Sequence, residues 1–279
     1  MKYLRLLRLP HQSIIFAVGL GFGAYFKVRN WWFFSWIVAA CLISICAFMV
    51  NELVDRDDCD RYSWNGIHIS SHDRYDWKIV FLMFAILTGG AFFIAYCDGL
   101  LWWAAAMYIL SLLYSIKPVR LKTRPVLDSF AQMAGGFALP FMAIQSRYVG
   151  PNDWPILIAI LCFIWALIFP YQLADYEADR KAKINGTHIL LGMKKSLAFG
   201  VSSLIIAAGI FFSFRYFMII PWANILIFLA GYALYSYWRW LRMAKIGDQI
   251  TSLQQFARVV SIASLLLVPY MLIVWLFVK

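Results

Sequence analysis

Charged residues are scarce in this sequence. Asp, Glu, Lys and Arg make up 14% of its 279 residues, whereas a typical soluble chain has about 25%. Hydrophobic residues reach 63%, and the mean hydropathy is +0.72. A soluble fold of this size would leave much of that apolar surface in contact with water. The composition therefore excludes a soluble enzyme and predicts a protein that lies in the lipid bilayer.

Paired cysteines are missing as well. The five cysteines stand singly along the chain, and no CxxC spacing occurs. This argues against a disulfide framework and against a zinc site built from cysteines.

The apolar residues gather in nine runs, each close to the 20 or so residues that a helix needs to cross a bilayer. The runs cover residues 13–29, 31–51, 78–97, 99–116, 126–146, 154–174, 195–214, 220–238 and 257–277. The first is interpreted as a span and not a signal peptide, because no small-residue cleavage site follows it. Too few residues remain for a soluble domain. We therefore expect an all-α integral membrane protein in which residues 1–279 form a single domain.

The basic residues account for the net charge of +11 and predict an orientation. If the N-terminus is cytoplasmic, 20 of the 25 Lys and Arg lie in the tail and loops of that side. This bias follows the positive-inside tendency of membrane proteins. It predicts a cytoplasmic N-terminus and a C-terminus on the opposite side. The charge also favours anionic headgroups or a phosphorylated substrate over nucleic acid as partners.

Eight of the 14 acidic residues lie in two short stretches. The stretches follow the second and the sixth apolar run: Glu52, Asp55, Asp57, Asp58 and Asp60 in the first, and Asp175, Glu177 and Asp179 in the second. Both emerge on the same predicted side, the cytoplasmic one. We expect them to face each other across a central cavity and to form a cap over it.

The spacing within these stretches indicates metal binding. Residues four positions apart share a helix face, and there are two such series: Asn51, Asp55 and Cys59, and Tyr171, Asp175, Asp179 and Lys183. Carboxylates one turn apart near a membrane need a counter-ion. Mg²⁺ suits them, since it prefers one or two carboxylates together with phosphate oxygens and water. The alternative is that these are helix-end acids solvated by a loop.

A basic loop separates the fourth run from the fifth. Four cations fall within eight residues: Lys117, Arg120, Lys122 and Arg124. Such groups bind phosphate oxygens, although loops on the cytoplasmic side are basic in any case. Pro118 and Pro125 predict a stiff, extended segment. Asp128 follows and is expected to cap the fifth helix; alternatively, Asp128 and Gln132 face an acceptor.

This loop and the stretches on either side resemble the UbiA superfamily of intramembrane prenyltransferases. The loop reads Tyr114-Ser-x-x-Pro118-x-Arg120-Leu-Lys122, followed by Arg-Pro-x-Leu-Asp. The second acidic stretch matches the family's D-x-x-x-D element, with an Arg after it and a later Thr and Leu-Gly.

The first acidic stretch resembles the family signature N-D-x-x-D-x-x-x-D. It matches at Asn51 and Asp55, and Glu52 stands at the second position. The ninth position departs from the signature, and three neighbouring residues remain candidates for it: Asp58, Cys59 or Asp60.

The resemblance implies nine transmembrane helices and Mg²⁺-dependent transfer of a prenyl group from an isoprenyl diphosphate to a lipophilic acceptor. It implies three catalytic carboxylates: Asp55, Asp175 and Asp179. It implies metal ligands among Asn51, Asp55, Asp58, Asp175 and Asp179. The expected substrate-binding residues are Asn51, Tyr114, Lys117, Arg120, Lys122, Arg124, Tyr171, Arg180 and Lys181.

The acceptor remains open between branches of this family. The loop is similar to that of members that prenylate carotenoids and other non-aromatic isoprenoids, the lycopene elongase branch. Branches that act on aromatic acids such as 4-hydroxybenzoate, or on quinone precursors, are the alternative. Outside the family, a cation-coupled transporter would need charges in the middle of its helices, whereas the acids here gather at helix ends.

Overall fold

The computed structural model describes residues 3, 7, 9–28, 30–55, 76–149, 154–213, 223–243 and 245–277, and these contain helices and no strand. The first half comprises α2 (Leu9–Tyr25), α3 (Trp31–Asp55), α4 (Trp77–Cys97), α5 (Leu101–Ser115), the 3₁₀ turn η1 (Leu121–Thr123), α6 (Leu127–Met133), η2 (Ala134–Ala138), α7 (Leu139–Ile144) and η3 (Gln145–Val149). The second half comprises α8 (Trp154–Ala174), α9 (Tyr176–Lys181), α10 (Thr187–Ser213), α12 (Ala223–Arg242) and α13 (Ile246–Phe277).

Each predicted apolar run overlaps a helical segment, and the largest differences are at the starts of α10 and α13, which begin well before the predicted runs. Helix α10 starts at Thr187 and α13 at Ile246, so much of the sequence between the sixth and seventh runs, and between the eighth and ninth, is helical. Non-helical backbone at Gly192 (φ 73°, ψ 168°) divides the first turns of α10 from the rest. Within the part of the chain that the structure describes, five helices are long and apolar enough to cross a membrane: Trp31–Val54, Trp77–Cys97, Trp154–Ala174, Thr187–Ser213 and Gly247–Ile273. The same part contains two shorter apolar helices, Gln12–Ala24 and Leu101–Ser115. The chain is a multi-pass membrane protein.

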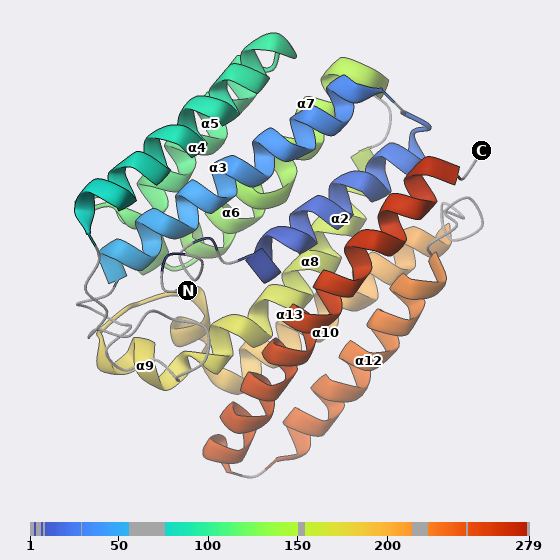
Figure 1. Ribbon diagram of the computed structural model, residues 1–279. Helices are drawn as coiled ribbons and strands as arrows, with labels where there is room; N and C mark the ends of the chain where they lie inside the picture. Colours follow the sequence, from blue (N-terminus) through green and yellow to red (C-terminus); the bar gives the residue numbers. More distant parts are fainter. Residues whose placement is uncertain are drawn as a thin grey trace.

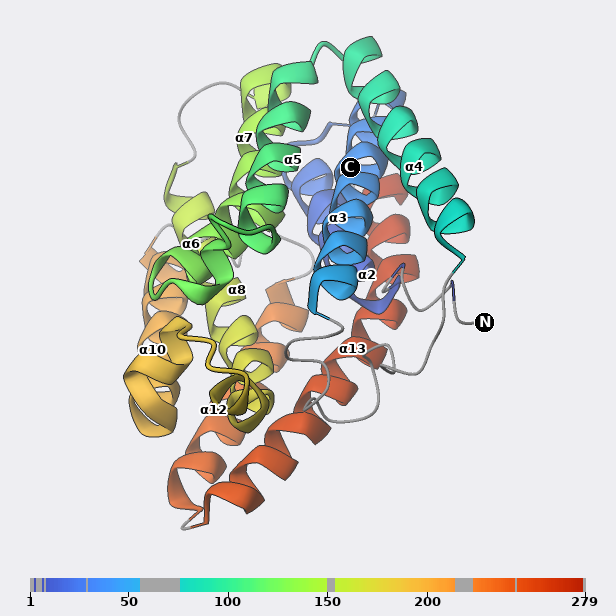
Figure 2. The same ribbon diagram turned by 90° about the vertical axis from the view of Figure 1, so that its left-hand side faces the viewer.

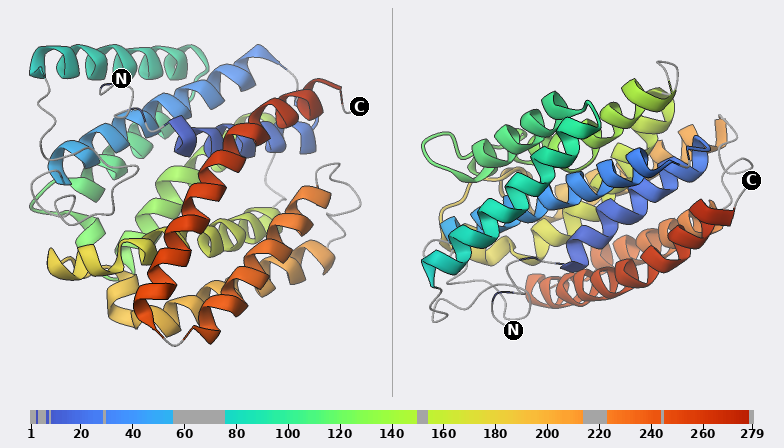
Figure 3. Two further views of the ribbon diagram at one scale, coloured as in Figure 1. Left: turned by 60° about the horizontal axis from the view of Figure 1, so that its bottom comes forward. Right: turned by 45° about the horizontal axis from the view of Figure 1, so that its top comes forward.

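The helices lie side by side in one tilted bundle (Figure 1). The most extensive packing joins α8 to α10 and α2 to α13, and α3 packs on both α4 and α5. The views in Figure 3 show α13 crossing the bundle beside α2 although the two are at opposite ends of the sequence. A buried cluster that includes Leu20, Phe33, Trp36 and Phe141 fills the centre.

The outward surface of the bundle is apolar. Phe81, Trp102 and Leu266 are 72%, 84% and 70% exposed. Large exposed apolar patches are rare on soluble monomers. Hydrocarbon tails contact such side chains without the penalty that water would impose, so the surface fits the bilayer predicted from composition.

The acid-bearing helices α3 and α8 end toward the same end of the bundle, where α9 lies (Figure 1). Helix α2 begins toward this end, whereas α13 finishes at the other one. At the far end, a tight turn at residues 98–100 joins α4 to α5, with Gly99 at φ +71°. Asp98 accepts a hydrogen bond from Ser35 there, at 2.8 Å, and burial raises the pKa of its carboxyl.

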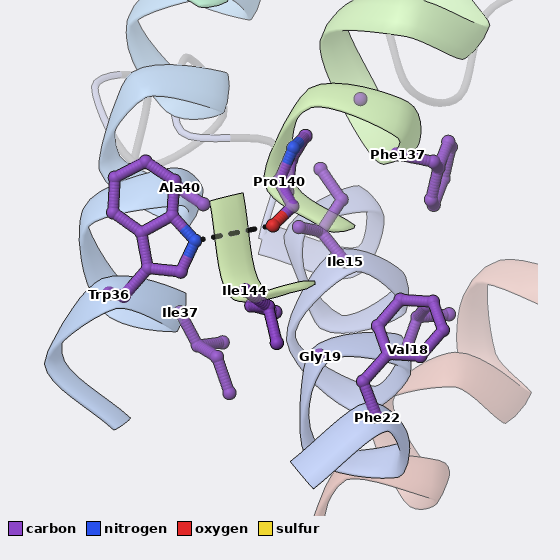
Figure 4. Close-up of a pocket in the computed structure, with 11 residues that line it drawn as sticks. Ile15, Val18, Gly19, Phe22, Trp36, Ile37, Ala40, Phe137, Pro140 and Ile144 are labelled. Carbon is purple, nitrogen blue, oxygen red and sulfur yellow. Dashed lines mark hydrogen bonds between the residues drawn. The ribbon is translucent and has the colours of Figure 1, made fainter. Parts of the chain in front are cut away.

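An apolar pocket lies deeper in the bundle, between α2, α3 and the η2–α7 segment (Figure 4). Its cavity volume is about 20 Å³, and its walls include Phe22, Trp36, Phe137 and Ile144. The Nε1–H of Trp36 donates a hydrogen bond to the carbonyl of Pro140, at 3.4 Å. The lining offers no charged group, so this pocket suits hydrocarbon.

Candidate functional site

The first acidic stretch begins in the last turn of α3. Asn51 lies four residues before the end of the helix, and its side-chain oxygen accepts a hydrogen bond from Ser115 at the end of α5 (3.1 Å). Glu52 is buried, at 1% exposure. Asp55 is the last residue of α3; its side chain lies outside what the structure describes, as do Asp58, Cys59 and Asp60.

The basic loop folds against Asn51. Lys122, in η1, is only 8% exposed, and its Nζ donates a hydrogen bond to Asn51 Oδ1 at 3.5 Å. Arg120 is buried as well, whereas Lys117 and Arg124 are exposed. Two of the four cations of the basic loop are thus buried, and the other two lie at the protein surface.

The expectation of an extended loop is wrong. The chain turns back through η1, and Arg120 and Val126 adopt left-handed φ values of 38° and 72°. The two prolines restrict their own and the preceding residues, but they leave the residues between them free to form a compact turn. The compact turn lets Lys122 reach α3.

The second acidic stretch does not continue α8. The helix ends at Ala174, Asp175 is a turn residue before the short helix α9, and Lys183 has a left-handed φ of 56°. The expectation that Tyr171, Asp175, Asp179 and Lys183 follow one helix face is therefore wrong. Tyr171 points instead to α13, where its hydroxyl donates to the carbonyl of Ala257 at 3.0 Å. Arg180 and Lys181 are exposed at the end of α9.

Asp179 meets a histidine that sequence reasoning missed. Its Oδ2 lies 2.9 Å from Nε2 of His188, in the first turn of α10. His188 is 4% exposed. Nine residues and a change of helix separate the two, so no helical spacing connects them. A histidine close to an acidic stretch was the only signal in the sequence.

Asp128 caps a different helix from the one expected. Helix α6 receives no side-chain hydrogen bond at its N-terminus. The Asp128 carboxylate instead accepts hydrogen bonds from the backbone N–H and the hydroxyl of Thr187, the first residue of α10; the N–H bond is 2.8 Å. The Thr187 hydroxyl also accepts from the N–H of Val126, at 2.7 Å. A carboxylate at a helix N-terminus is favoured by the unpaired N–H groups and the helix dipole.

Three polar side chains form a line across the bundle beside these ends. Gln172 of α8 donates to Gln132 of α6 at 3.2 Å, and Gln132 donates to the hydroxyl of Tyr114 of α5 at 2.6 Å. Gln132 lies one turn from Asp128, and Gln172 is three residues before Asp175. The line therefore lies next to the acidic and basic groups, at their membrane side.

These contacts join the three predicted motifs in space. Lys122 connects the basic loop to α3, Asp128 connects the residues after the loop to α10, and His188 connects α10 to α9. Figure 2 shows α6 with its preceding loop, α9 and the start of α10 as neighbours. The arrangement presents carboxylates and cations together, which suits an anion that arrives with a metal ion.

The carboxylate oxygens on and beside α9 are of the kind that Mg²⁺ binds. No group of three or more His, Cys, Asp and Glu that could hold a metal occurs within the described ranges. Mg²⁺ does not require such a group, because it usually takes one or two carboxylates and completes its shell with substrate phosphate and water. Asp175 and Asp179 would supply these carboxylates, and Asn51 an amide oxygen.

Replacing Asp128 with alanine is expected to destabilise the protein by about 2 kcal/mol or more, because it removes two hydrogen bonds to a buried carboxylate and a helix cap. Thermal unfolding in detergent micelles measures this. Asp248→Ala, at an exposed acid in the first turn of α13, is the control and should change little. Equal stability of the two variants would contradict the assigned role of Asp128.

A family model for the UbiA prenyltransferase family matches residues 13–265. A protein named "Lycopene elongase/hydratase" from Haloferax volcanii is 28% identical over 165 residues, covering 58% of this chain and 51% of that protein. One with the same name from Halobacterium salinarum is 33% identical over 109 residues, 38% of each chain. The chain thus matches about half the length of these relatives, or less.

Solved structures of a UbiA homolog from Archaeoglobus fulgidus have the same fold. The form bound to DMAPP and Mg²⁺ has a TM-score of 0.69 and 20% identity, covering 96% of this chain and 99% of that one. The form bound to GPP and Mg²⁺ also has a TM-score of 0.69, with 21% identity and coverage of 96% and 100%.

Proposed function

The chain belongs to the UbiA prenyltransferase family, and on that premise we propose that it transfers a prenyl group from an isoprenyl diphosphate to a lipophilic acceptor in the membrane. Mg²⁺ is the proposed cofactor. The observation that carries the proposal is the set of hydrogen bonds that joins the basic loop to the acidic end of α3 directly, and the residues after the loop to α9 by way of α10. The related structures that hold a prenyl diphosphate with Mg²⁺ support the choice of donor.

In this proposal the cations hold the diphosphate. Lys122 and Arg120, which are buried, neutralise the inner oxygens, and Lys117, Arg124, Arg180 and Lys181 contact it from the surface. Asp55, Asp175 and Asp179 hold the metal ion, with Asn51 and Asp58 as further ligands. Tyr114 and Tyr171 are the proposed substrate contacts on the helices.

The reaction breaks the bond between C1 of the donor and its diphosphate oxygen, and the diphosphate leaves with the electron pair. A bound Mg²⁺ supplies stabilisation for the charge that develops on the leaving diphosphate. The basic side chains add to this without reorganising, since the fold already positions them. The acceptor's π electrons then form the new carbon–carbon bond, and the acceptor loses a proton. The lipid-embedded helices exclude water from the allylic cation.

An acyclic isoprenoid of the carotenoid type is the proposed acceptor. The two curated relatives named for lycopene support this. An aromatic acid or a quinone precursor is the alternative acceptor within the family.

We propose further that residues 1–279 form one domain of nine transmembrane helices. The acidic ends and the basic loop would form a cap on the cytoplasmic side, with the N-terminus on that side and the C-terminus opposite. The 20-to-5 division of Lys and Arg supports this orientation.

The deciding experiment incubates the purified protein in nanodiscs with a radiolabelled prenyl diphosphate, lycopene and Mg²⁺. We expect labelled, elongated carotenoid, no transfer in excess EDTA, and recovery when Mg²⁺ is restored. A parallel reaction with 4-hydroxybenzoate tests the alternative acceptor. Transfer that continues in EDTA would contradict the role of Mg²⁺, and the absence of any prenylated product would contradict the function.

A further inference from the structure

We propose that His188 is a positioning residue, which holds the Asp179 carboxylate in the orientation that binds the metal ion of the metal–diphosphate complex. The inference rests on the proposed function and extends it to a residue outside the motifs. His188 itself would contact neither metal nor substrate.

The contact between the two side chains is well placed for this role. His188 Nε2 is 2.9 Å from Asp179 Oδ2, and the side chains are 5% and 18% exposed. Because one carboxylate oxygen is held by the ring, the carboxylate has a fixed orientation. Its other oxygen remains available to a ligand. Hydrogen-bonded partners of this kind orient metal-binding side chains in many proteins.

The histidine ring is itself held tightly. A Cβ at Gly186 would lie 2.9 Å from His188 Cε1 and 2.9 Å from Asp128 Oδ2, so the backbone at this glycine closes against both side chains. The ring of Tyr176 lies across that of His188 with a centroid distance of 6.4 Å. Asp179 is therefore connected to a rigid neighbour and not to a mobile surface residue.

The other ring nitrogen argues for a function beyond packing. His188 Nδ1 is buried and has no hydrogen-bond partner among the described residues. Burying a polar atom without a partner destabilises a fold. An apolar side chain of similar size would fill this position without that penalty. What only the histidine supplies is the contact from Nε2 to Asp179.

The test compares His188→Leu, which keeps the volume and removes the contact, with His188→Gln, which keeps a donor. Binding of Mn²⁺ in the presence of inorganic pyrophosphate is measured by electron paramagnetic resonance on the full chain, without turnover. We expect Mn²⁺ affinity to fall about 10-fold or more in His188→Leu, in line with losses seen when such partners are removed. His188→Gln should recover most of it. The half-saturating Mg²⁺ concentration in the transfer assay should rise from the wild-type protein to His188→Gln and be highest in His188→Leu.

Two further variants separate positioning from folding. Gln249→Ala removes another buried side chain, whose amide donates to the carbonyls of Trp240 and Met243 at 2.8 and 3.1 Å; it should lower the melting temperature and leave Mn²⁺ affinity unchanged. Gly186→Ala adds a Cβ that meets both the His188 ring and the Asp128 carboxylate, so it should disturb the start of α10 with the ring and weaken Mn²⁺ binding.

The outcomes are distinguishable. Wild-type affinity in His188→Leu, or in Gly186→Ala if the leucine variant does not fold, would overturn the inference while the proposed function stands. The same holds if His188→Gln binds no better than His188→Leu. If the wild-type protein binds neither Mn²⁺ nor pyrophosphate, the proposed function fails and the inference fails with it.

Discussion

Asp179→Asn is expected to lower the rate of prenyl transfer about 100-fold or more, the size of effect typical when a group that stabilises the leaving charge is removed. Asparagine has nearly the same shape and can still contact His188, but it carries no charge for the metal ion. The initial rate at saturating donor and acceptor, with Mg²⁺ held constant, measures the effect. Asp175→Asn should give a loss of similar size. The fold-loss of rate in the double variant should be smaller than the product of the two single fold-losses, since both carboxylates serve one ion.

Asp248→Asn is the matched control for these variants. Asp248 is an exposed acid in the first turn of α13. The Asp248→Asn variant makes the same change of charge at a position away from α9, so its transfer rate should equal that of the wild-type protein. An Asp179→Asn variant that folds and keeps its rate would remove α9 from the catalytic site.

Lys122→Met is expected to raise the KM for the prenyl diphosphate about 10- to 100-fold, because a hydrogen bond between charged groups contributes about 1.5–3 kcal/mol. Lys122 is almost buried and lies against Asn51, so water compensates poorly for the missing ammonium group. Methionine preserves most of the side-chain volume. Initial rates at a series of donor concentrations measure the effect, and Lys122→Arg should recover part of it.

Lys195→Met provides the comparison. Lys195 is an exposed lysine of α10 outside the basic loop, and its replacement should leave the donor KM unchanged. Melting temperatures of both variants in nanodiscs separate a loss of binding from a loss of folding. If the two lysine variants have the same donor KM, the buried cation of η1 does not bind the diphosphate.

Composition predicted much of the fold. The apolar runs are long, their residues face either lipid or other helices, and a helix satisfies its own backbone hydrogen bonds in lipid. For this reason each run overlaps a helix. The ends of helices were predicted less well. Polar segments such as the one before residue 195 can also form helices when a cap or a buried face stabilises them, as Asp128 does at the start of α10.

The candidate site was predicted in part. The two acidic stretches follow the second and the sixth apolar run, and successive spans cross the membrane in alternating directions. This is enough to expect α3 and α8 to end at the same side of the bundle (Figure 1). The four-residue spacing from Tyr171 to Lys183 was misleading, because it continued a helix that ends at Ala174. A short break changes the direction of every side chain after it.

By itself, the sequence determined that this protein lies in the membrane, that it is helical, and that acids and bases gather at helix ends. These properties depend on composition and on neighbours within a few turns. Only the tertiary structure decided that Lys122 reaches Asn51, that Asp128 caps α10, and that His188 holds Asp179. The first two pairs are separated by 71 and 59 positions, and the third crosses a turn. Such contacts arise from the packing of whole helices against one another, which no local spacing encodes.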